Sequence, residues 1–465
     1  MTSVQNHLRL LNGNNLLVFF IIIAGISSCA SKKITTTKNV EVVAIQTKEN
    51  NKEPNFSNTS KAYEDSVSKK PVIFDLDNNS NQTNTTNTNT NTSVKNTKIL
   101  NNDENRVYNV AVILPFNLSQ IPLGQYADDT TKQLGVDSKN AMEFYLGCQM
   151  AREKFESEHL KTNVYFLDDK NDSLTMVSLF KQKPFPNVDY IIGPLYFKNL
   201  KTAADLAKNN QIPLVSPLAN SMYISDNPYY FNAVGSVKAQ YSFILEQTKA
   251  KFPSKTLEVI YDGQDSTAES IEILKSVADK YYGYAGIKYT SLQAWSDASK
   301  SMAWSDTLSE RVILIYSSKY SYIKSVIAKL KPLKNHLQIF TSSAAKDIKA
   351  LVDAKNPHSV YTVFPFNSSN PNYSFFAAKY EDKHKKKASE TSCQAYDLMM
   401  HLFYLLDKNQ ALQDNVYNYS ADFDNTQTKF QFKPVLNKNG ELDYYDNTFL
   451  YLYKYLNGTF VIATP

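Results

Sequence analysis

Hydrophobic and polar positions alternate along this chain in a pattern that predicts strands and helices in regular succession. Short apolar runs end at proline, glycine or polar residues, as buried strands do. Between them, residues 137–157 place Ala141, Phe144 and Cys148 on one helical face, and the opening Asp137–Ser138 pair predicts an N-cap. The first expected strands are VYNVAVILPF (107–116), NVYFLDD (163–169), YIIGP (190–194) and IPLVSP (212–217), with helices over 137–157 and 198–210.

A second series of the same kind follows. Strands are expected at 256–262, 286–292, 311–318, 337–343 and 359–366, with helices over 266–282 and 322–330. Alternating strands and helices imply parallel sheets with right-handed crossovers. The two series predict an α/β fold of two doubly wound, Rossmann-like lobes with a hinge and an interlobe cleft. Ligands of such sheets bind at the carboxyl ends of the strands.

The start of the chain has the pattern of an export signal. An apolar run at 16–26 is too short to span a bilayer, which needs ~20 apolar residues, and it lies between Arg9 and the small residues Ser27 and Ser28. With Cys29 it resembles the lipobox of bacterial lipoproteins, whose cysteine is diacylated and becomes the new N-terminus. The resemblance implies a signal peptide at 1–28, lipidation of Cys29 and export. An ordinary secreted protein with a chance cysteine is the alternative. The sequence after Cys29 lacks an aspartate, which by resemblance favours an outer-membrane anchor facing the periplasm.

Residues 29–105 show no hydrophobic periodicity. The stretch NNSNQTNTTNTNTNTSVKNT (78–97) has too little apolar surface to offset chain entropy, which predicts a disordered Asn/Thr-rich linker. As a coil it would span ~50 Å. The patch PVIFDLD (71–77) is most simply a lone apolar patch; a strand or a docking peptide is the alternative. The linker leaves a globular unit at 106–465, which exceeds one comfortable core and favours two lobes.

Composition excludes several classes of protein. Lys and Arg number 50 against 45 Asp and Glu, and a net charge of +5 is too small to indicate nucleic acid as a partner. The basic run KHKKK (383–387) is expected to be a solvated helix end or loop. Beyond Cys29 only Cys148 and Cys393 remain, so a disulfide framework is excluded. Each is expected to be a buried apolar residue on a helix, with one bond between them as the alternative.

Several motifs in order resemble the type I periplasmic-binding-protein fold, which includes the Leu/Ile/Val-binding proteins. They are VAVILPF (110–116), IIGPLY (191–196), IPLVSPLAN (212–220) and NPYYFNAVGSVKAQ (227–240), and the similarity continues to about residue 460. The resemblance implies a first lobe at about 106–238 and 367–425, and a second lobe at about 239–366 and 426–465.

The same resemblance implies where a ligand would bind. In amino-acid binders of this family, the loops after "GP" and at "SPAAT" hold the ligand carboxylate through hydroxyls and backbone N–H groups at helix N-termini. The hydroxyl-rich run is missing here, and Leu218 is bulkier than the usual alanine, so amino-acid binding is in doubt. The first-lobe candidates are Asn117, Tyr196, Phe197, Lys198, Ser216, Leu218, Ala219 and Asn220. The second-lobe candidates, which would suit a sugar, peptide or glycan fragment, are Tyr261, Gln264, Tyr316, Ser317, Ser318, Tyr320, Thr341 and Ser342. Packing at strand ends is the alternative for each.

No enzyme signature is present. The sequence contains no G-x-S-x-G, Walker A, H-E-x-x-H or C-x-x-C motif, and no histidine pair has metal-ligand spacing. We expect no catalytic residue, metal or cofactor. Ser321–Lys324 matches S-x-x-K, but a surface position on a helix explains it. Asp168, Asp169 and Asp172 crowd after a strand, where solvated or capping carboxylates are expected.

Two functions therefore remain for a non-enzymatic binding protein. The first is a lipid-anchored solute-binding protein that captures an amino acid, sugar or peptide-like ligand between two lobes for a transporter or sensor. The second is an envelope interaction protein, because GPLYFKNL (193–200) resembles lipoprotein activators of penicillin-binding peptidoglycan synthases. The long linker and the bulky Tyr196, Phe197 and Leu218 favour the second. The helical-repeat domain that such activators often carry is missing, which is a departure.

Overall fold

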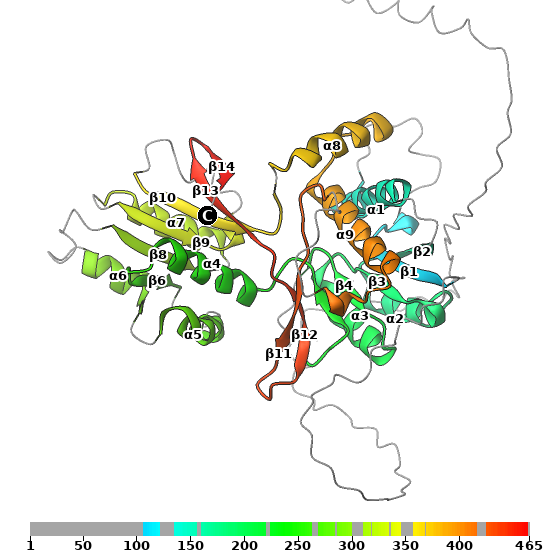
Figure 1. The fold of residues 1–465 in the computed structure, drawn as a ribbon, viewed down its shortest axis with the longest axis horizontal. Coiled ribbons are helices and arrows are strands. Elements are labelled where there is room, and N and C mark those ends of the chain that lie inside the picture. The colour runs from blue at the N-terminus through cyan, green and yellow to red at the C-terminus, as the bar shows by residue number, and fades with distance from the viewer. Residues whose placement is uncertain are drawn as a thin grey trace, which may run out of the picture. The chain divides into compact units, whose positions relative to one another are not determined.

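The computed structural model describes residues 106–120, 134–155, 160–219, 224–262, 268–283, 286–299, 310–317, 319–333, 336–345, 357–367, 369–415 and 425–463. The predicted signal peptide, Cys29 and the linker lie outside this part of the chain. Within it, the strands form two sheets, each with its own helices, which confirms the predicted α/β fold of two lobes (Figure 1).

The first lobe is built on a sheet in the order β11-β12-β5-β4-β3-β1-β2. Its strands are β1 (Val107–Leu114), β2 (Lys161–Asp168), β3 (Tyr190–Ile192), β4 (Leu214–Ser216), β5 (Tyr230–Asn232), β11 (Phe432–Leu436) and β12 (Leu442–Asn447). Neighbours from β2 to β12 pair in parallel, and β11 is antiparallel to β12. Strand β1, between β3 and the edge strand β2, reads VYNVAVIL and is buried on both faces, as parallel strands covered by helices are.

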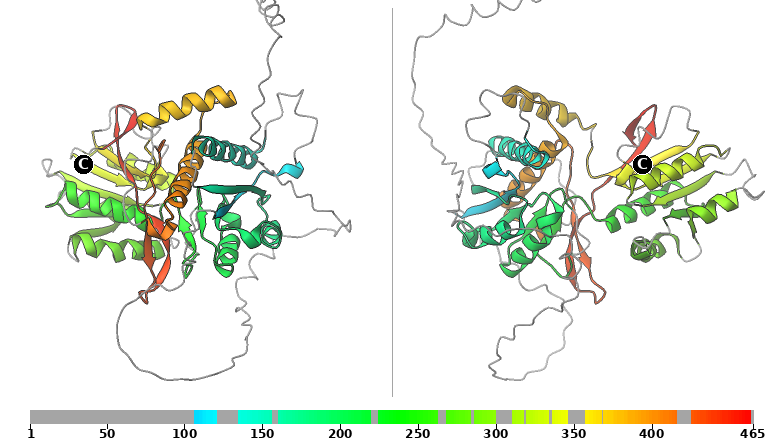
Figure 2. Two further views of the ribbon diagram at one scale, coloured as in Figure 1. Left: turned by 45° about the vertical axis from the view of Figure 1, so that its right-hand side comes forward. Right: turned by 180° about the vertical axis from the view of Figure 1, so that it is seen from behind.

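Helices cover both faces of this sheet. On one face α1 (Val136–Lys154), α8 (Pro371–His384) and α9 (Glu390–Asp407) pack over Val110, Val112 and Leu114 of β1. On the other face α2 (Ser173–Phe180) and α3 (Phe197–Asn209) pack over Ala111 and Ile113. Figure 2 shows the two groups from two further sides. The alternation along β1 divides the lobe into two cores because successive side chains point to opposite faces.

The second lobe has a sheet in the order β14-β13-β10-β9-β8-β6-β7. Its strands are β6 (Leu257–Tyr261), β7 (Ile287–Ser291), β8 (Arg311–Tyr316), β9 (Leu337–Thr341), β10 (Ser359–Phe364), β13 (Tyr451–Leu456) and β14 (Thr459–Ile462). Strands β6 to β10 run parallel, while β13 and β14 are antiparallel additions. Its helices are α4 (Val237–Lys251), α5 (Ala268–Tyr282), α6 (Leu292–Ser299) and α7 (Tyr320–Leu330).

Buried carboxylates fasten the segments where the chain changes lobe. Asp446, at the end of β12, accepts the backbone N–H of Ser236 at 2.8 Å and the amide of Asn232 at 3.1 Å, and also binds the Ser236 hydroxyl. Ser236 is the N-cap of α4, the first helix of the second lobe. Burial raises the pKa of Asp446 to about 6. The start of α4 is thus tied to the first-lobe strand β12.

A second buried carboxylate, Asp397 of α9, holds residues 426–428. It accepts the backbone N–H groups of Thr426, Gln427 and Thr428 at 2.5, 2.9 and 2.7 Å. These residues pair in turn with the segment after β10, through a bridge from Thr428 to Phe366. Asp397 therefore aligns a strand-like connection that the sequence pattern did not predict.

The structure differs from the predictions at several points. Strands β11 and β12 belong to the first sheet, so sheet membership does not follow the predicted boundary at residue 426. Helix α1 has Gly135 as its N-cap without a side-chain bond, so the predicted Asp137–Ser138 cap is wrong. The helix α2 was not predicted. Among the described residues, Cys148 and Cys393 are buried and unbonded, as expected.

No helix of the described residues is both long and apolar enough to cross a membrane. The basic run at 383–387 spans the end of α8, where Lys385 is the C-cap in the left-handed conformation. Lys386 bonds Glu143 of α1 at 2.5 Å, and Lys383 pairs with Glu153. The predicted helix-end position of this run is confirmed.

Candidate functional site

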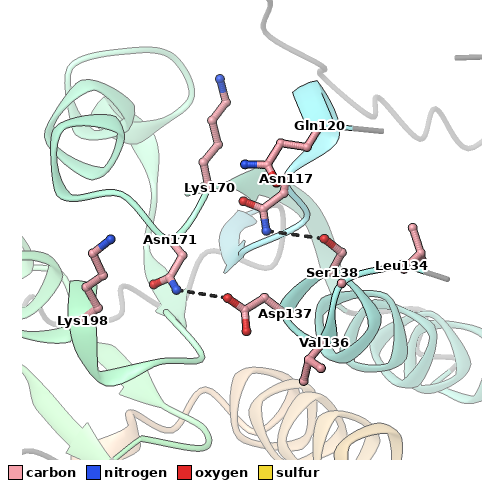
Figure 3. Close-up of a pocket in the computed structure, with 10 residues that line it drawn as sticks. Asn117, Gln120, Leu134, Val136, Asp137, Ser138, Lys170, Asn171 and Lys198 are labelled. Carbon is pink, nitrogen blue, oxygen red and sulfur yellow. Dashed lines mark hydrogen bonds between the residues drawn. The ribbon is translucent and has the colours of Figure 1, made fainter. Parts of the chain in front are cut away.

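A cavity of about 640 Å³ lies at the carboxyl ends of β1 and β2 in the first lobe (Figure 3). Its walls come from the loop after β1, the loop after β2 and the N-termini of α1 and α3. The lining residues are Asn117, Gln120, Leu134, Gly135, Val136, Asp137, Ser138, Lys170, Asn171 and Lys198. This is the edge at which parallel α/β sheets bind ligands.

Asp168, the last residue of β2, joins the two loops of the cavity. Its carboxylate accepts the backbone N–H of Asn117 at 3.0 Å and of Leu118 at 2.9 Å, both from the loop after β1. It also accepts the N–H of Lys170 at 3.0 Å. Asn117 takes a left-handed conformation with φ of 54°, which asparagine tolerates better than most residues. The Asp168 carboxylate thus fixes the backbone positions of Asn117 and Lys170, both of which line the cavity.

The neighbouring Asp169 ties the loop after β2 to the start of α3. It is 2% exposed and accepts the Asn199 side-chain amide at 2.9 Å, and Asn199 in turn accepts the Ser173 hydroxyl. Burial raises the pKa of Asp169, against the hydrogen bonds from Asn199 and the Asn171 N–H that lower it. Asn199 follows Lys198 directly, so this buried network positions Lys198 at the cavity. Asp172 caps α2 by accepting the Thr175 N–H at 2.7 Å, which confirms the predicted capping role.

The cavity presents both cationic and amide groups. Lys170 and Lys198 are exposed, and neither forms an ion pair within the described part of the chain. Asp137 is already engaged, because it accepts the Asn171 amide at 3.1 Å (Figure 3). The Oδ1 atom of Asn171 is buried, with no hydrogen-bond partner among the described residues. The site can therefore offer two ammonium donors to an anionic or acceptor-rich group.

Most of the predicted first-lobe residues do not line this cavity. Asn117 does. Tyr196 instead packs against the core, and its hydroxyl accepts the Asn140 amide at 2.8 Å; burial raises its pKa. Ser216 is fully buried and donates to the Ala219 carbonyl at 2.5 Å. Leu218 packs on the same core as Tyr196.

Of the other first-lobe residues, Ala219 packs against the opposite core, and Phe197 is exposed. Asn220 lies outside the described residues. The positions that the family resemblance assigned to a ligand carboxylate are thus largely occupied by bonds and packing within the lobe.

The predicted second-lobe residues lie at the carboxyl ends of β6, β8 and β9. Tyr316 is buried, with its ring centroid 4.3 Å from that of Tyr241. Thr341 is buried, and the Ser342 hydroxyl donates to the Ser317 carbonyl at 2.8 Å. These contacts agree with packing at strand ends.

The remaining second-lobe candidates are less enclosed. Tyr261 and Tyr320 are half-buried, whereas Gln264 and Ser318 lie outside the described residues. The Ser317 hydroxyl accepts the N–H of Lys319 at 3.0 Å, so it shapes the turn into α7.

Sequence reasoning missed most of the cavity. It singled out Asn117 and Lys198, but not Gln120, the residues before α1, Lys170 or Asn171. Two consecutive non-glycine residues with positive φ, Lys170 and Asn171, mark the loop after β2. The asparagine at position 171 was the sequence feature that could have indicated this loop, because asparagine is enriched in conformations with positive φ.

The remaining chemical candidates have structural explanations. Ser321 and Lys324 are exposed on α7, as expected for a surface position. Within the described residues no cluster of three His, Cys, Asp or Glu side chains could hold a metal ion.

Comparison with known proteins shows the fold. No protein-family model matches the sequence, and no curated protein matches it. Solved structures do match. A candidate branched-chain amino acid ABC transporter from Rhodospirillum rubrum has a TM-score of 0.54 at 12% identity, over 77% of this chain and 100% of that chain. An ABC transporter substrate-binding protein from Desulfitobacterium hafniense gives 0.51 at 13% identity, with the same coverage.

LpoA from Haemophilus influenzae is also similar, with a TM-score of 0.51 at 14% identity over 78% of this chain. The match spans 60% of the LpoA chain. At these identities the likeness establishes the architecture: the described part of this chain has the type I periplasmic-binding-protein fold, with two α/β lobes.

Proposed function

We propose that this protein is an exported, lipid-anchored, non-enzymatic binding protein that captures a small polar ligand carrying an anionic or acceptor-rich group. The observation that carries the proposal is the first-lobe cavity, where neither Lys170 nor Lys198 forms an ion pair with another described residue. Capture would serve a transporter or a sensor; a protein that shares the fold is named an ABC transporter substrate-binding protein.

The chemistry of the cavity favours a polar ligand over an apolar one. Amide side chains of Asn117, Gln120 and Asn171 join the two lysines, and Ser138 adds a hydroxyl. Small-ligand sites combine a concave shape with a few placed polar groups, and this cavity has the volume of such a site. A carboxylate or phosphate placed near the lysines would gain charge-assisted hydrogen bonds.

A second candidate function rests on a different observation. The loops that would hold a ligand carboxylate in amino-acid binders are filled here by Leu218 and by the Ser216–Ala219 bond. Such a lobe suits an envelope interaction protein that binds through its surface. LpoA has the same fold, and its C-domain is described as a regulator of PBP1A. On this reading the partner would be a peptidoglycan synthase.

A thermal-shift screen separates the two functions. The full mature chain is screened against amino acids, sugars and muropeptides, because a ligand that binds only the folded state raises the melting temperature. A ligand at 100 times its Kd adds about 2.7 kcal/mol of stability. The variant carrying Lys170→Ala and Lys198→Ala should lose that shift.

The matched control is Lys201→Ala, one turn along α3, whose lysine is exposed and pairs with Asp205 at 2.8 Å. Its ligand-induced shift should equal that of the unmodified protein. If the double variant keeps the full shift, the cavity is not the site. If no compound shifts the protein while purified synthase binds it, the solute-binding proposal fails and the interaction proposal stands.

A further inference from the structure

The hairpin of β13 and β14 in the second lobe is closed by an asparagine followed by a glycine (Figure 1). Its two-residue loop consists of Asn457 and Gly458, with φ of 49° and 87°. Positive φ at both positions is typical of the type I′ turn, for which asparagine and glycine are the favoured pair. Leu456, the last residue of β13, pairs with Thr459, the first residue of β14. The geometry of the turn therefore explains why these two residue types stand here.

An asparagine–glycine pair can also rearrange without an enzyme, with water as the only co-reactant. The glycine backbone nitrogen attacks Cγ of the asparagine side chain, and glycine favours this because it has no Cβ to obstruct the approach. The new N–Cγ bond forms as the Cγ–Nδ2 bond breaks. The proton of the glycine N–H passes through water to Nδ2, which leaves as ammonia. One water then opens the succinimide ring at either carbonyl, which gives aspartate or isoaspartate.

The loop between β13 and β14 leaves the reacting groups accessible. Asn457 and Gly458 are exposed, and a Cβ built on Gly458 would meet no atom within 4 Å beyond its chain neighbours. The Gly458 N–H donates to no acceptor among the residues that the structure describes. The glycine nitrogen can therefore approach Cγ of Asn457 without first breaking a hydrogen bond.

A second asparagine–glycine pair in the described part of the chain differs in this respect. Asn439 and Gly440 lie in the loop between β11 and β12 and are also exposed. There the Gly440 N–H donates to the Asn437 carbonyl at 3.0 Å, and the Asn439 N–H donates to the Asn437 side chain at 2.9 Å. The Gly440 bond must break before its nitrogen can attack. A net contribution of the usual size for one hydrogen bond slows that reaction about fivefold.

We propose that Asn457 is a site of spontaneous covalent modification, at which the folded protein accumulates aspartate and isoaspartate faster than at Asn439. Either product adds a negative charge, and isoaspartate adds one atom to the backbone of the two-residue loop. The pairing of Leu456 with Thr459 depends on the length of that loop. Isoaspartate therefore loosens β14, the edge strand of the second sheet. This change involves neither the first-lobe cavity nor any ligand.

Peptide mass spectrometry of the full mature chain, aged at pH 8.0 and compared with a fresh sample, tests the proposal. We expect the peptide with Asn457 to lose its side-chain amide at least about fivefold faster than the peptide with Asn439. In urea the two rates should converge, because Gly440 no longer holds its hydrogen bond. Electron-transfer fragmentation separates isoaspartate from aspartate. The Asn457→Gln variant should remove the products from that peptide, because its longer side chain cannot form the same five-membered ring.

Three outcomes would overturn the proposal. They are equal rates at the two pairs in the folded chain, a faster rate at Asn439, and a reaction at Asn457 in urea but not in the folded protein. The last would show that the hairpin protects its own asparagine. Hydrogen exchange measures the structural consequence separately. The backbone amides of β14 should exchange faster in the isoaspartate fraction than in fresh protein, and an unchanged rate would refute the loosening.

Discussion

The buried His401 should make the first lobe sensitive to acid. This residue lies on α9 with no exposed surface, and its ring centroid is 5.2 Å from that of Phe430 and 5.7 Å from that of Phe432. Burial lowers its pKa to about 3. In the unfolded chain an ordinary histidine has a pKa of ~6.5. Between these values the unfolded state binds a proton that the folded state refuses.

The sign and size follow from that difference. Because the unfolded state binds more protons, stability rises with pH, and the stability associated with His401 is lost as the pH falls from about 6.5 toward 3. At pH 5.0 the proton taken up by the unfolded histidine lowers the free energy of unfolding by RT ln(1 + 10^1.5), or about 2 kcal/mol. The pKa of His401 in the folded protein has almost no effect on this free energy as long as it lies well below 5, because the folded histidine is then unprotonated at pH 5.0.

The assay compares His401→Gln with the unmodified protein by urea unfolding at pH 7.5 and pH 5.0. Glutamine does not titrate, so the unmodified protein should lose about 2 kcal/mol more than the variant between the two pH values. The transition should be followed by circular dichroism and not by tryptophan fluorescence. Trp295 lies in the second-lobe core, so its fluorescence would report on that lobe and not on the lobe that contains His401. Asp397, one turn earlier on α9, is present in both proteins, so its own titration cancels in the comparison. Equal losses in the two proteins would refute the reasoning.

Three further predictions concern residues of α1 and α9. Gly147→Ala should lower the free energy of unfolding by roughly 2–3 kcal/mol, because its Cβ would overlap the Ser392 carbonyl. Urea unfolding measures this, and Gly135→Ala, with open space around its Cβ, should cost no more than about 1 kcal/mol, the size of an N-cap preference. Asp397→Asn should cost about 2–4 kcal/mol by the same assay, since at least one buried N–H loses its acceptor; an unchanged midpoint would show that these bonds contribute nothing. Cys148 and Cys393 should resist iodoacetamide in the folded protein and react in urea, because burial raises the pKa of both thiols, that of Cys393 to about 12. Peptide mass spectrometry would detect any labelling of the native protein, which would contradict this.

Local patterns in the sequence were enough to predict the two α/β lobes. The apolar run of β1 and the one-sided pattern of α1 report whether each segment is buried on two faces or one, and such patterns act over a few residues. The cap at Asp172 could be predicted for the same reason, because an N-cap bond joins residues only three apart. The burial of Cys148 and Cys393 could be predicted because both lie on apolar faces of expected helices.

Only the tertiary structure decided where the cavity lies and what holds it. Asp168 reaches back 51 positions to bind the N–H of Asn117, and Asp169 reaches forward 30 to Asn199. The pairing of β12 with β5 likewise brings Asp446 to Ser236, 210 positions earlier. Hydrophobic periodicity carries no information about such partners, because a buried carboxylate is satisfied by whichever N–H groups the completed sheet brings to it.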